Sequence, residues 1–149
     1  MKTIRIYVDT SVFGGIVDQE FQNASLNFFN LIRDHKFILV TSPIVAGEIQ
    51  FAPDAVKNLF DELLPIAELV HLTQEAIDLQ QLYLQHEIVS SKYADDAFHV
   101  ALATVSNCVM IISWNFKHLV HFDKIPLYNA INLLKGYSQI AIYSPLEVI

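Results

Sequence analysis

Five polar residues of this sequence have types and positions suited to catalysis. Asp95 and Asp96 stand side by side in the segment KYADDAFHVALATVSNC, and His99 follows one helical turn later. At about 100° per residue these three side chains lie on one polar stripe of a helix that is otherwise apolar. Asp9 and Glu48 lie much earlier in the chain. Adjacent carboxylates in the first turn of a buried helix are either capping groups or chemical groups, and the other elements decide between these roles.

Carboxylates brought together from separate elements repel one another, so they stay ionised together only beside a cation. Ligation by oxygen alone suits Mg²⁺ or Mn²⁺ rather than zinc. Such an ion favours phosphoryl chemistry, because it lowers the pKa of a bound water and stabilises the charge that builds on phosphate oxygens. The sequence therefore predicts a Mg²⁺ or Mn²⁺ site if Asp9, Glu48 and the Asp95–Asp96 pair converge.

The elements that must position these acids alternate between strands and helices. Asp9 ends the apolar run Ile4–Val8, which is typical of a buried strand, and sites in open α/β sheets form at that end of the strands. Glu48 belongs to a predicted helix in which Ser42 provides the cap and Pro43 the first residue. Both acids thus stand just after the end of a predicted strand.

The stretch from Lys92 to His118 organises the rest of the chain. It predicts a buried helix, a turn at Asn107, a strand at Val109–Ile112 and a polar loop at Ser113–Asn115. Further strands are expected at Phe37–Val40, Ile66–Leu72 and Gln139–Tyr143, further helices at Asn23–Asp34, Asp54–Leu64, Thr73–His86 and within Val120–Leu134, and a terminal turn at Ser144–Glu147. This alternation predicts an α/β fold with a mainly parallel sheet.

The composition indicates one well-filled domain over residues 1–149. Apolar residues make up 53% of the chain and charged residues 17%, against usual values of about 45–50% and about 25%. The apolar excess leaves part of the surface for a partner chain, and no apolar run approaches the roughly 18 residues of a membrane span. The start MKTIRIYVDTS is expected to be a strand, not a signal peptide. The single cysteine, Cys108, excludes an internal disulfide framework and fits a reducing cytosol, so a cytoplasmic location is expected.

The net charge of −7 argues against a nucleic-acid binder, unless converging acids hold a metal that reverses the local sign. Nucleotide-binding folds are disfavoured because neither G-x-x-x-x-G-K-[ST] nor G-x-G-x-x-G occurs. The first strand ends in D-T-S rather than in an aspartate pair, which weakens a phosphatase of the haloacid dehalogenase type. Four histidines follow no metal-ligand spacing and are expected at the surface: His35, His71, His86 and His121. His99 either contacts the phosphate or leaving group, or only hydrogen-bonds a carboxylate.

The strand ending V-D-T-S-V at Asp9, the helix acid Glu48, and A-D-D-A-F-H-V-A-L-A followed by a strand and S-W-N resemble PIN-domain nucleases. That family includes the VapC-type toxins, and the resemblance spans nearly the whole chain. It implies a three-layer α/β/α fold with a mainly parallel sheet of four to five strands. It also implies that Asp9, Glu48 and Asp96 bind the metal, with Asp95 as an additional or outer ligand.

The fourth acid of the family usually follows the next strand, where this sequence has Asn115. As a catalytic residue, Asn115 offers a carbonyl oxygen or holds a metal-bound water, but it brings no charge. The missing charge bears on metal affinity and on a two-metal mechanism, whereas a one-metal scheme is unaffected.

The segment after the last acid position also suits RNA binding. An aromatic residue beside a cation and a histidine, as in Trp114, Lys117 and His118, can stack a base and contact a phosphate. The alternative is that Trp114 and Phe116 belong to the core and Lys117 is solvated. The full set of substrate-binding candidates is Thr10, Ser11, His99, Ser113, Trp114, Lys117 and His118.

The resemblance implies a metal-dependent endoribonuclease that leaves a 5′-phosphate and a 3′-hydroxyl. As a toxin it would have a separate antitoxin chain that covers the site, and the apolar excess would serve that partner and a homodimer. A second hypothesis is a PIN-like RNA- or protein-binding module that has lost catalysis, which the neutral Asn115 and the negative charge favour. A third is a phosphatase of small substrates that uses the same acids.

Overall fold

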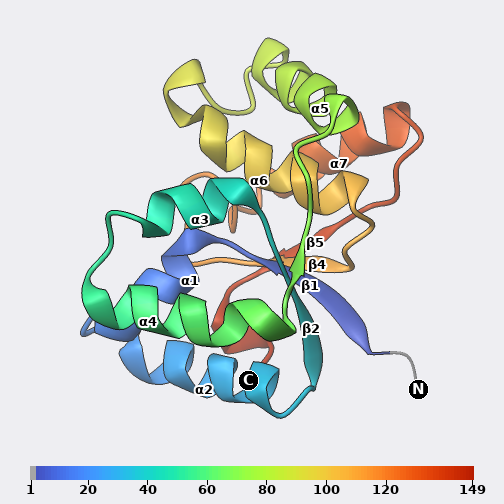
Figure 1. Ribbon diagram of the computed structural model, residues 1–149. Coiled ribbons are helices and arrows are strands. Elements are labelled where there is room, and N and C mark those ends of the chain that lie inside the picture. The colour runs from blue at the N-terminus through green and yellow to red at the C-terminus, as the bar shows by residue number, and fades with distance from the viewer. Residues whose placement is uncertain (1–2) are drawn as a thin grey trace.

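One parallel sheet of five strands forms the centre of the fold (Figure 1). The computed structural model describes residues 3–149. The strands are β1 (Ile4–Val8), β2 (Phe37–Thr41), β3 (Glu68–Leu69), β4 (Met110–Ile112) and β5 (Ala141–Tyr143), in the spatial order β3-β2-β1-β4-β5. All neighbouring strands run parallel, so their carboxyl ends lie along one edge. The predicted α/β class and mainly parallel sheet are confirmed.

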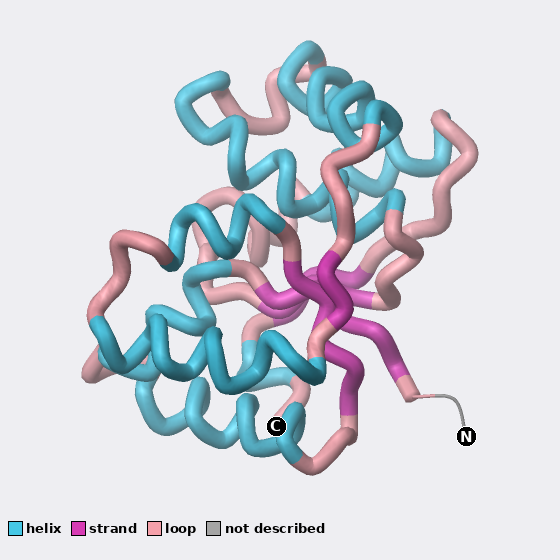
Figure 2. The backbone as a smooth tube through the Cα atoms, in the orientation of Figure 1, coloured by secondary structure: helices cyan, strands magenta, loops and turns pink. Residues whose placement is uncertain are grey.

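Helices cover both faces of this sheet and give three layers (Figure 2). The helices are α1 (Thr10–Gly14), α2 (Gln22–Arg33), α3 (Pro43–Ile49), α4 (Asp54–Leu63), α5 (Gln74–Gln85), α6 (Ala94–Val105) and α7 (Ile125–Leu134). In Figure 1, α5, α6 and α7 lie together above the sheet, whereas α2 and α4 lie below it. Short 3₁₀ turns join them: η1 (Gly15–Val17), η2 (Leu64–Ile66), η3 (Ser91–Tyr93) and η4 (Pro145–Glu147).

The central strand, β1, explains why the first acid lies where it does. Residues 6–8 of β1 are fully buried, as expected for a parallel strand with helices on both faces. Val8 pairs with Ile112 of β4, and the backbone N–H of Asp9 continues the ladder by donating to the Ile112 carbonyl at 3.2 Å. The residues that follow β1 and β4 therefore emerge side by side at the carboxyl edge.

Helix α6 is the buried helix that the sequence predicts. It contacts both β4 and α5, and seven of its residues are buried: Ala97, His99, Val100, Ala101, Leu102, Ala103 and Thr104. It begins at Ala94, because the 3₁₀ turn η3 occupies the three preceding residues. Asp95 and Asp96 are the acidic residues of its first turn, where the helix dipole favours negative charge.

Two predicted elements differ from the observed ones. The strand expected at Ile66–Leu72 is wrong in length, because only Glu68–Leu69 pairs with β2 while Pro65 holds η2 in a 3₁₀ turn. At the end of the central strand β1, the strand-to-helix turn that the sequence indicates after Asp9 is itself a helix, α1, which Asp9 caps. No helix among residues 3–149 is both long enough and apolar enough to cross a membrane.

Candidate active site

Asp9 is held in a fixed orientation at the end of β1. Its Oδ1 accepts hydrogen bonds from the backbone N–H of Ser11 at 3.1 Å and from the Ser11 hydroxyl at 2.6 Å, and its Oδ2 accepts from the Ser113 hydroxyl at 2.6 Å. Only 4% of Asp9 is exposed. Burial raises the pKa of this carboxyl above its usual range, although His99 and the two serines partly offset that effect. Asp9 is therefore both a helix cap and a carboxylate whose ionisation costs free energy.

Glu48 reaches the same edge of the sheet from α3. Its Oε1 accepts hydrogen bonds from His99 Nε2 at 2.8 Å and from the Thr10 hydroxyl at 3.1 Å, while its side chain keeps 37% exposure. Burial acts to raise the pKa of Glu48, but the bonds from His99 and Thr10 outweigh it, so the pKa lies below the usual value. The described chain donates no hydrogen bond to Oε2, which leaves that oxygen free for a ligand.

A chain of buried hydrogen bonds stands behind Glu48. His99 Nδ1 lies 2.7 Å from the Tyr7 hydroxyl, which lies 2.8 Å from the Ser42 hydroxyl. Because ionised Glu48 can only accept, the Nε2 of His99 must carry the proton of that contact. Burial acts to lower the pKa of His99, but the bond to Glu48 and the nearby carboxylates of Asp9, Glu48 and Asp96 raise it above its ordinary value.

Asp96 and Asn115 form the third part of the site. Asn115 Oδ1 accepts from the backbone N–H of His118 at 2.9 Å, and the Asn115 side chain lies near enough to Asp96 to favour the charged form of its carboxyl. Since a carboxylate is an acceptor, the amide NH₂ of Asn115 is the part that favours it. Burial raises the pKa of Asp96, although Asn115, His118 and His99 partly oppose this rise. The residue at the fourth acid position therefore supports Asp96, and its carbonyl oxygen is engaged by the loop.

Asp95 faces a different direction from Asp96. It is exposed and lines a shallow hollow with residues of α3 and the segment that follows it, among them Ile44, Glu48 and Phe51. Phe51 is 87% exposed, so this hollow opens widely to solvent. Asp95 thus touches the outer side of the site through Glu48 and not the side where Asp9 lies.

The residue types fit a hard divalent cation, because Asp9, Glu48 and Asp96 offer carboxylate oxygens and influence one another's charge. The raised pKa values of Asp9 and Asp96 are also those that a nearby cation would bring down. Within residues 3–149, however, no group of three or more His, Cys, Asp or Glu side chains is already placed to hold a metal. The acids surround His99, and metal binding would draw them closer together.

The remaining substrate-binding candidates have separate positions. Trp114 is buried, stacks on Phe21 with ring centroids 4.2 Å apart, and donates from Nε1 to the Ser25 hydroxyl, so it packs in the core. Lys117 is exposed, whereas His118 is buried beside the Tyr93 ring. Thr10, Ser11, Ser113 and His99 contact the acids as described above.

Sequence reasoning missed Tyr7, Ser42 and Tyr93. Alternation along β1 gives no signal for Tyr7, because this strand is buried on both faces. Ser42 is predictable as a helix cap, and its hydroxyl does accept from the Val45 N–H, but its second contact, with Tyr7, depends on the pairing of β1 with β2.

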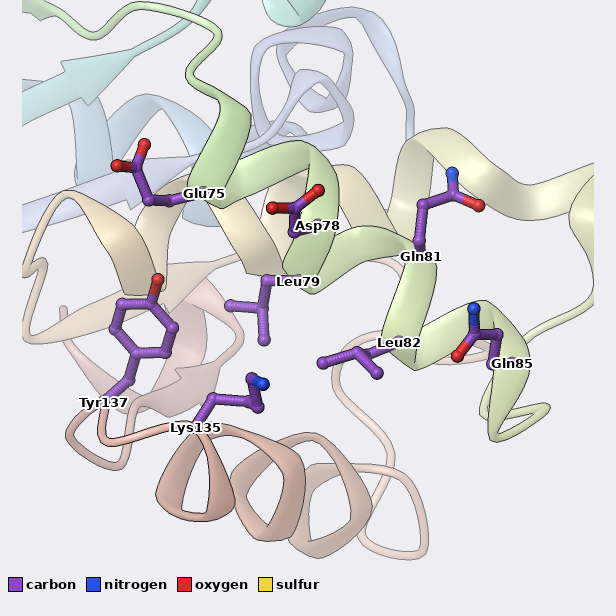
Figure 3. Close-up of a pocket in the computed structure, with 8 residues that line it drawn as sticks. All are labelled: Glu75, Asp78, Leu79, Gln81, Leu82, Gln85, Lys135 and Tyr137. Carbon is purple, nitrogen blue, oxygen red and sulfur yellow. The ribbon is translucent and has the colours of Figure 1, made fainter.

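A larger hollow, of about 420 Å³, lies between α5 and the end of α7 (Figure 3). The carboxylates of Glu75 and Asp78 and the ammonium of Lys135 lie around it, together with Tyr137. None of its lining residues belongs to the carboxylate site, so the volume of a hollow does not locate the chemistry in this protein.

Comparisons with known proteins bear on the family and the fold of the chain. A family model described as PIN domain matches residues 5–117. VapBC2 from Rickettsia felis, bound to a DNA fragment from their promoter, shares the fold with 12% identity and a TM-score of 0.61, and the match covers 95% of this chain and 98% of that chain. FitAcB from Neisseria gonorrhoeae shares it with 13% identity and a TM-score of 0.59, and the match covers 95% of this chain and 98% of that chain. Mycobacterium tuberculosis VapC20, a Sarcin-Ricin loop cleaving toxin, shares it with 14% identity and a TM-score of 0.56, and the match covers 91% of this chain and 98% of that chain. No curated protein matches the sequence.

Proposed function

Because the chain belongs to the PIN-domain family, we propose that it is a metal-dependent endoribonuclease that hydrolyses RNA phosphodiester bonds. The observation that supports this proposal best is the contact of Glu48 with the buried His99, whose pKa the nearby carboxylates of Asp9 and Asp96 also raise. The similar fold of VapC20, a Sarcin-Ricin loop cleaving toxin, supports a cleaving activity for this chain. Products with a 5′-phosphate and a 3′-hydroxyl follow from the resemblance to the family.

Asp9, Glu48 and Asp96 would hold Mg²⁺ or Mn²⁺. When bound, the ion would lower the pKa of a water and offset charge on the phosphate oxygens. The protein's own contribution is orientation: Ser11 and Ser113 fix Asp9, and Asn115 fixes Asp96. These donors hold the carboxylates in place before substrate arrives, so less entropy is lost in reaching the transition state.

His99 acts as a positioning residue in this proposal. Its N–H holds one oxygen of Glu48 and leaves the other oxygen, Oε2, for the ion. Tyr7 and Ser42 fix the orientation of the imidazole from behind. Because His99 is only 2% exposed, it has no direct path to the substrate.

We also propose that the chain is the toxin of a toxin–antitoxin pair. VapC20, which is a toxin, shares its fold, and so do VapBC2 and FitAcB. Apolar side chains stand at the surface, with Phe51 87%, Phe122 81% and Leu134 76% exposed, and these would suit an antitoxin and a second copy of the chain.

The test is cleavage of structured and single-stranded RNA with Mn²⁺, Mg²⁺ or EDTA, by wild type and by Asp96→Asn. We expect metal-dependent cutting that falls by more than about 100-fold in Asp96→Asn, since even outer partners of metal ligands are worth 10–100-fold. Asp61→Asn, at an exposed position on α4, is the matched control and should cut normally.

Three outcomes separate the hypotheses. Folded wild type that binds Mn²⁺ but cuts no RNA would favour a binding module, to which the neutral Asn115 also points. Hydrolysis of p-nitrophenyl phosphate without RNA cleavage would favour a small-molecule phosphatase. Undiminished cutting in EDTA would contradict the metal requirement itself.

A further inference from the structure

Two lysines from distant parts of the chain meet at one aromatic ring. Lys92 lies in η3 and Lys117 in the loop after β4, yet their Nζ atoms are 5.6 Å and 5.5 Å from the centroid of the Tyr93 ring. Both lysines are exposed. At these distances the ring face attracts each ammonium, so Tyr93 gathers positive charge at this point of the surface.

The positive charge of Lys92 and Lys117 at one ring contrasts with the acidic character of the rest of the protein. The chain has nine Lys and Arg residues and a net charge of −7. Arg5 pairs with Glu68 and Arg33 with Glu62, both at 2.6 Å, whereas the described residues include no carboxylate within 4.0 Å of either Lys92 or Lys117. Both ammonium groups lie near one ring, so an anion bound beside that ring would be attracted by both.

His118 provides an independent sign of a missing ligand. The centroids of the His118 and Tyr93 rings are 4.0 Å apart, and 92% of His118 is buried. Neither of its ring nitrogens has a hydrogen-bond partner among residues 3–149. A buried polar group without a partner is costly, and such groups in native proteins usually mark an absent water, ion or ligand.

Lys92, Lys117 and His118 lie around Tyr93, and these four residues form a basic cluster that borders the proposed active site. The backbone N–H of His118 donates to Asn115 Oδ1, and both Asn115 and His118 lie near enough to Asp96 to lower the pKa of its carboxyl, so the cluster adjoins the third acid. A polyanionic chain crossing the acids therefore meets these cations next. No covalent step is involved, and the cluster would act through charge and hydrogen bonding alone.

We propose that Lys92, Tyr93, Lys117 and His118 form a subsite for the RNA backbone phosphate that neighbours the scissile phosphate. This inference rests on the proposed function, since RNA must be the substrate. It explains how an acidic protein holds RNA: the acids face the metal, while a separate basic cluster takes the backbone. The two exposed ammonium groups supply the charge that attracts a backbone phosphate, and the buried His118 ring packs against Tyr93 beside them.

The test is the salt dependence of RNA binding, measured by fluorescence polarisation of a labelled single-stranded RNA in EDTA. For single strands, the slope of log K against log salt changes by about 0.7 for each phosphate contact. We expect the double variant Lys92→Gln/Lys117→Gln to lose about 0.7 from the slope and about tenfold in affinity at low salt. The matched control Lys36→Gln/Lys135→Gln removes the same charge at exposed positions elsewhere and should keep the wild-type slope.

The outcomes distinguish this inference from the proposed function. If wild type neither binds nor cuts RNA, the proposed function fails, and the inference fails with it. If wild type binds and cuts RNA but both double variants have its slope, only the inference is overturned. If a poly-glutamate peptide, and not RNA, loses affinity in Lys92→Gln/Lys117→Gln, the cluster recognises an acidic protein segment and the inference is wrong.

Discussion

Replacing Asn115 by aspartate tests how the site holds its third acid. The Asn115 amide favours the charged form of Asp96, and its Oδ1 accepts from the backbone N–H of His118. In Asn115→Asp the accepting oxygen remains, so the loop keeps its turn, but the donor to Asp96 is lost. Two half-buried carboxylates then stand side by side, where only a proton or a cation can offset their repulsion.

The magnitude follows from the loss of this amide. A hydrogen bond to a charged group is worth about 1.5–3 kcal/mol, so we expect the free energy of unfolding in EDTA to fall by about 2 kcal/mol. For a domain of this length, that is a fall of about 4–8 °C in Tm. In saturating Mn²⁺ the new carboxylate should tighten the site, and each tenfold gain in affinity returns about 1.4 kcal/mol.

The assay is thermal unfolding of wild type and Asn115→Asp, in EDTA and across a Mn²⁺ titration. Asn58→Asp adds the same charge at an exposed position on α4 and should change neither Tm nor the response to Mn²⁺. Equal Tm values for wild type and Asn115→Asp in EDTA would refute the role given to the amide. A Tm difference that Mn²⁺ fails to narrow would show that residue 115 does not share a cation with Asp96.

Three further predictions concern other parts of the site. In Gly15→Ala the new Cβ would lie 2.9 Å from Trp114 Nε1, so urea unfolding should show a loss of about 1–3 kcal/mol, whereas Gly14→Ala, with no atom within 4 Å of its Cβ, should cause none. The pKa of His99 is raised in the folded, metal-free protein. Protonated His99 therefore stabilises the fold fully below its unfolded pKa of about 6.5, and this stabilisation is lost as the pH rises through the pKa of the folded state. The stability advantage of wild type over His99→Gln in urea should therefore shrink with rising pH, and a constant advantage would contradict the assignment. Asp95→Asn should leave RNA cleavage nearly unchanged, and a loss as large as that of Asp96→Asn would make Asp95 a ligand.

The acids are predictable because local sequence fixes where they stand. Asp9 directly follows the apolar run of β1, and Asp96 lies in the first turn of α6, so a correct assignment of two elements places both. Parallel strands then bring the following residues to one edge of the sheet. The positions of these acids at the ends of their elements therefore predict that they lie near one edge of the sheet.

The partners of the acids are not predictable in this way. His99 contacts Tyr7, 92 residues away, and Glu48, 51 residues away, and these contacts depend on how α6 packs against β1 and α3. Likewise, the apolar run Ile66–Leu72 gives no sign that its strand is at the sheet edge and pairs over two residues only. Local patterns assign elements, whereas strand order and packing decide contacts between them.

Each acid of the site has polar neighbours that stabilise its charge, and this suggests a role for the neutral residue Asn115 at the position of the fourth acid. Asp9 accepts hydrogen bonds from Ser11 and Ser113, and Glu48 accepts them from Thr10 and His99. Asn115 favours the charged form of Asp96. A cation that binds these carboxylates must compete with those donors or share oxygens with them. Metal affinity in this protein therefore depends on the donors as well as on the number of acids. Asn115 lowers the cost of keeping Asp96 ionised before a cation arrives, which an aspartate at that position could not do.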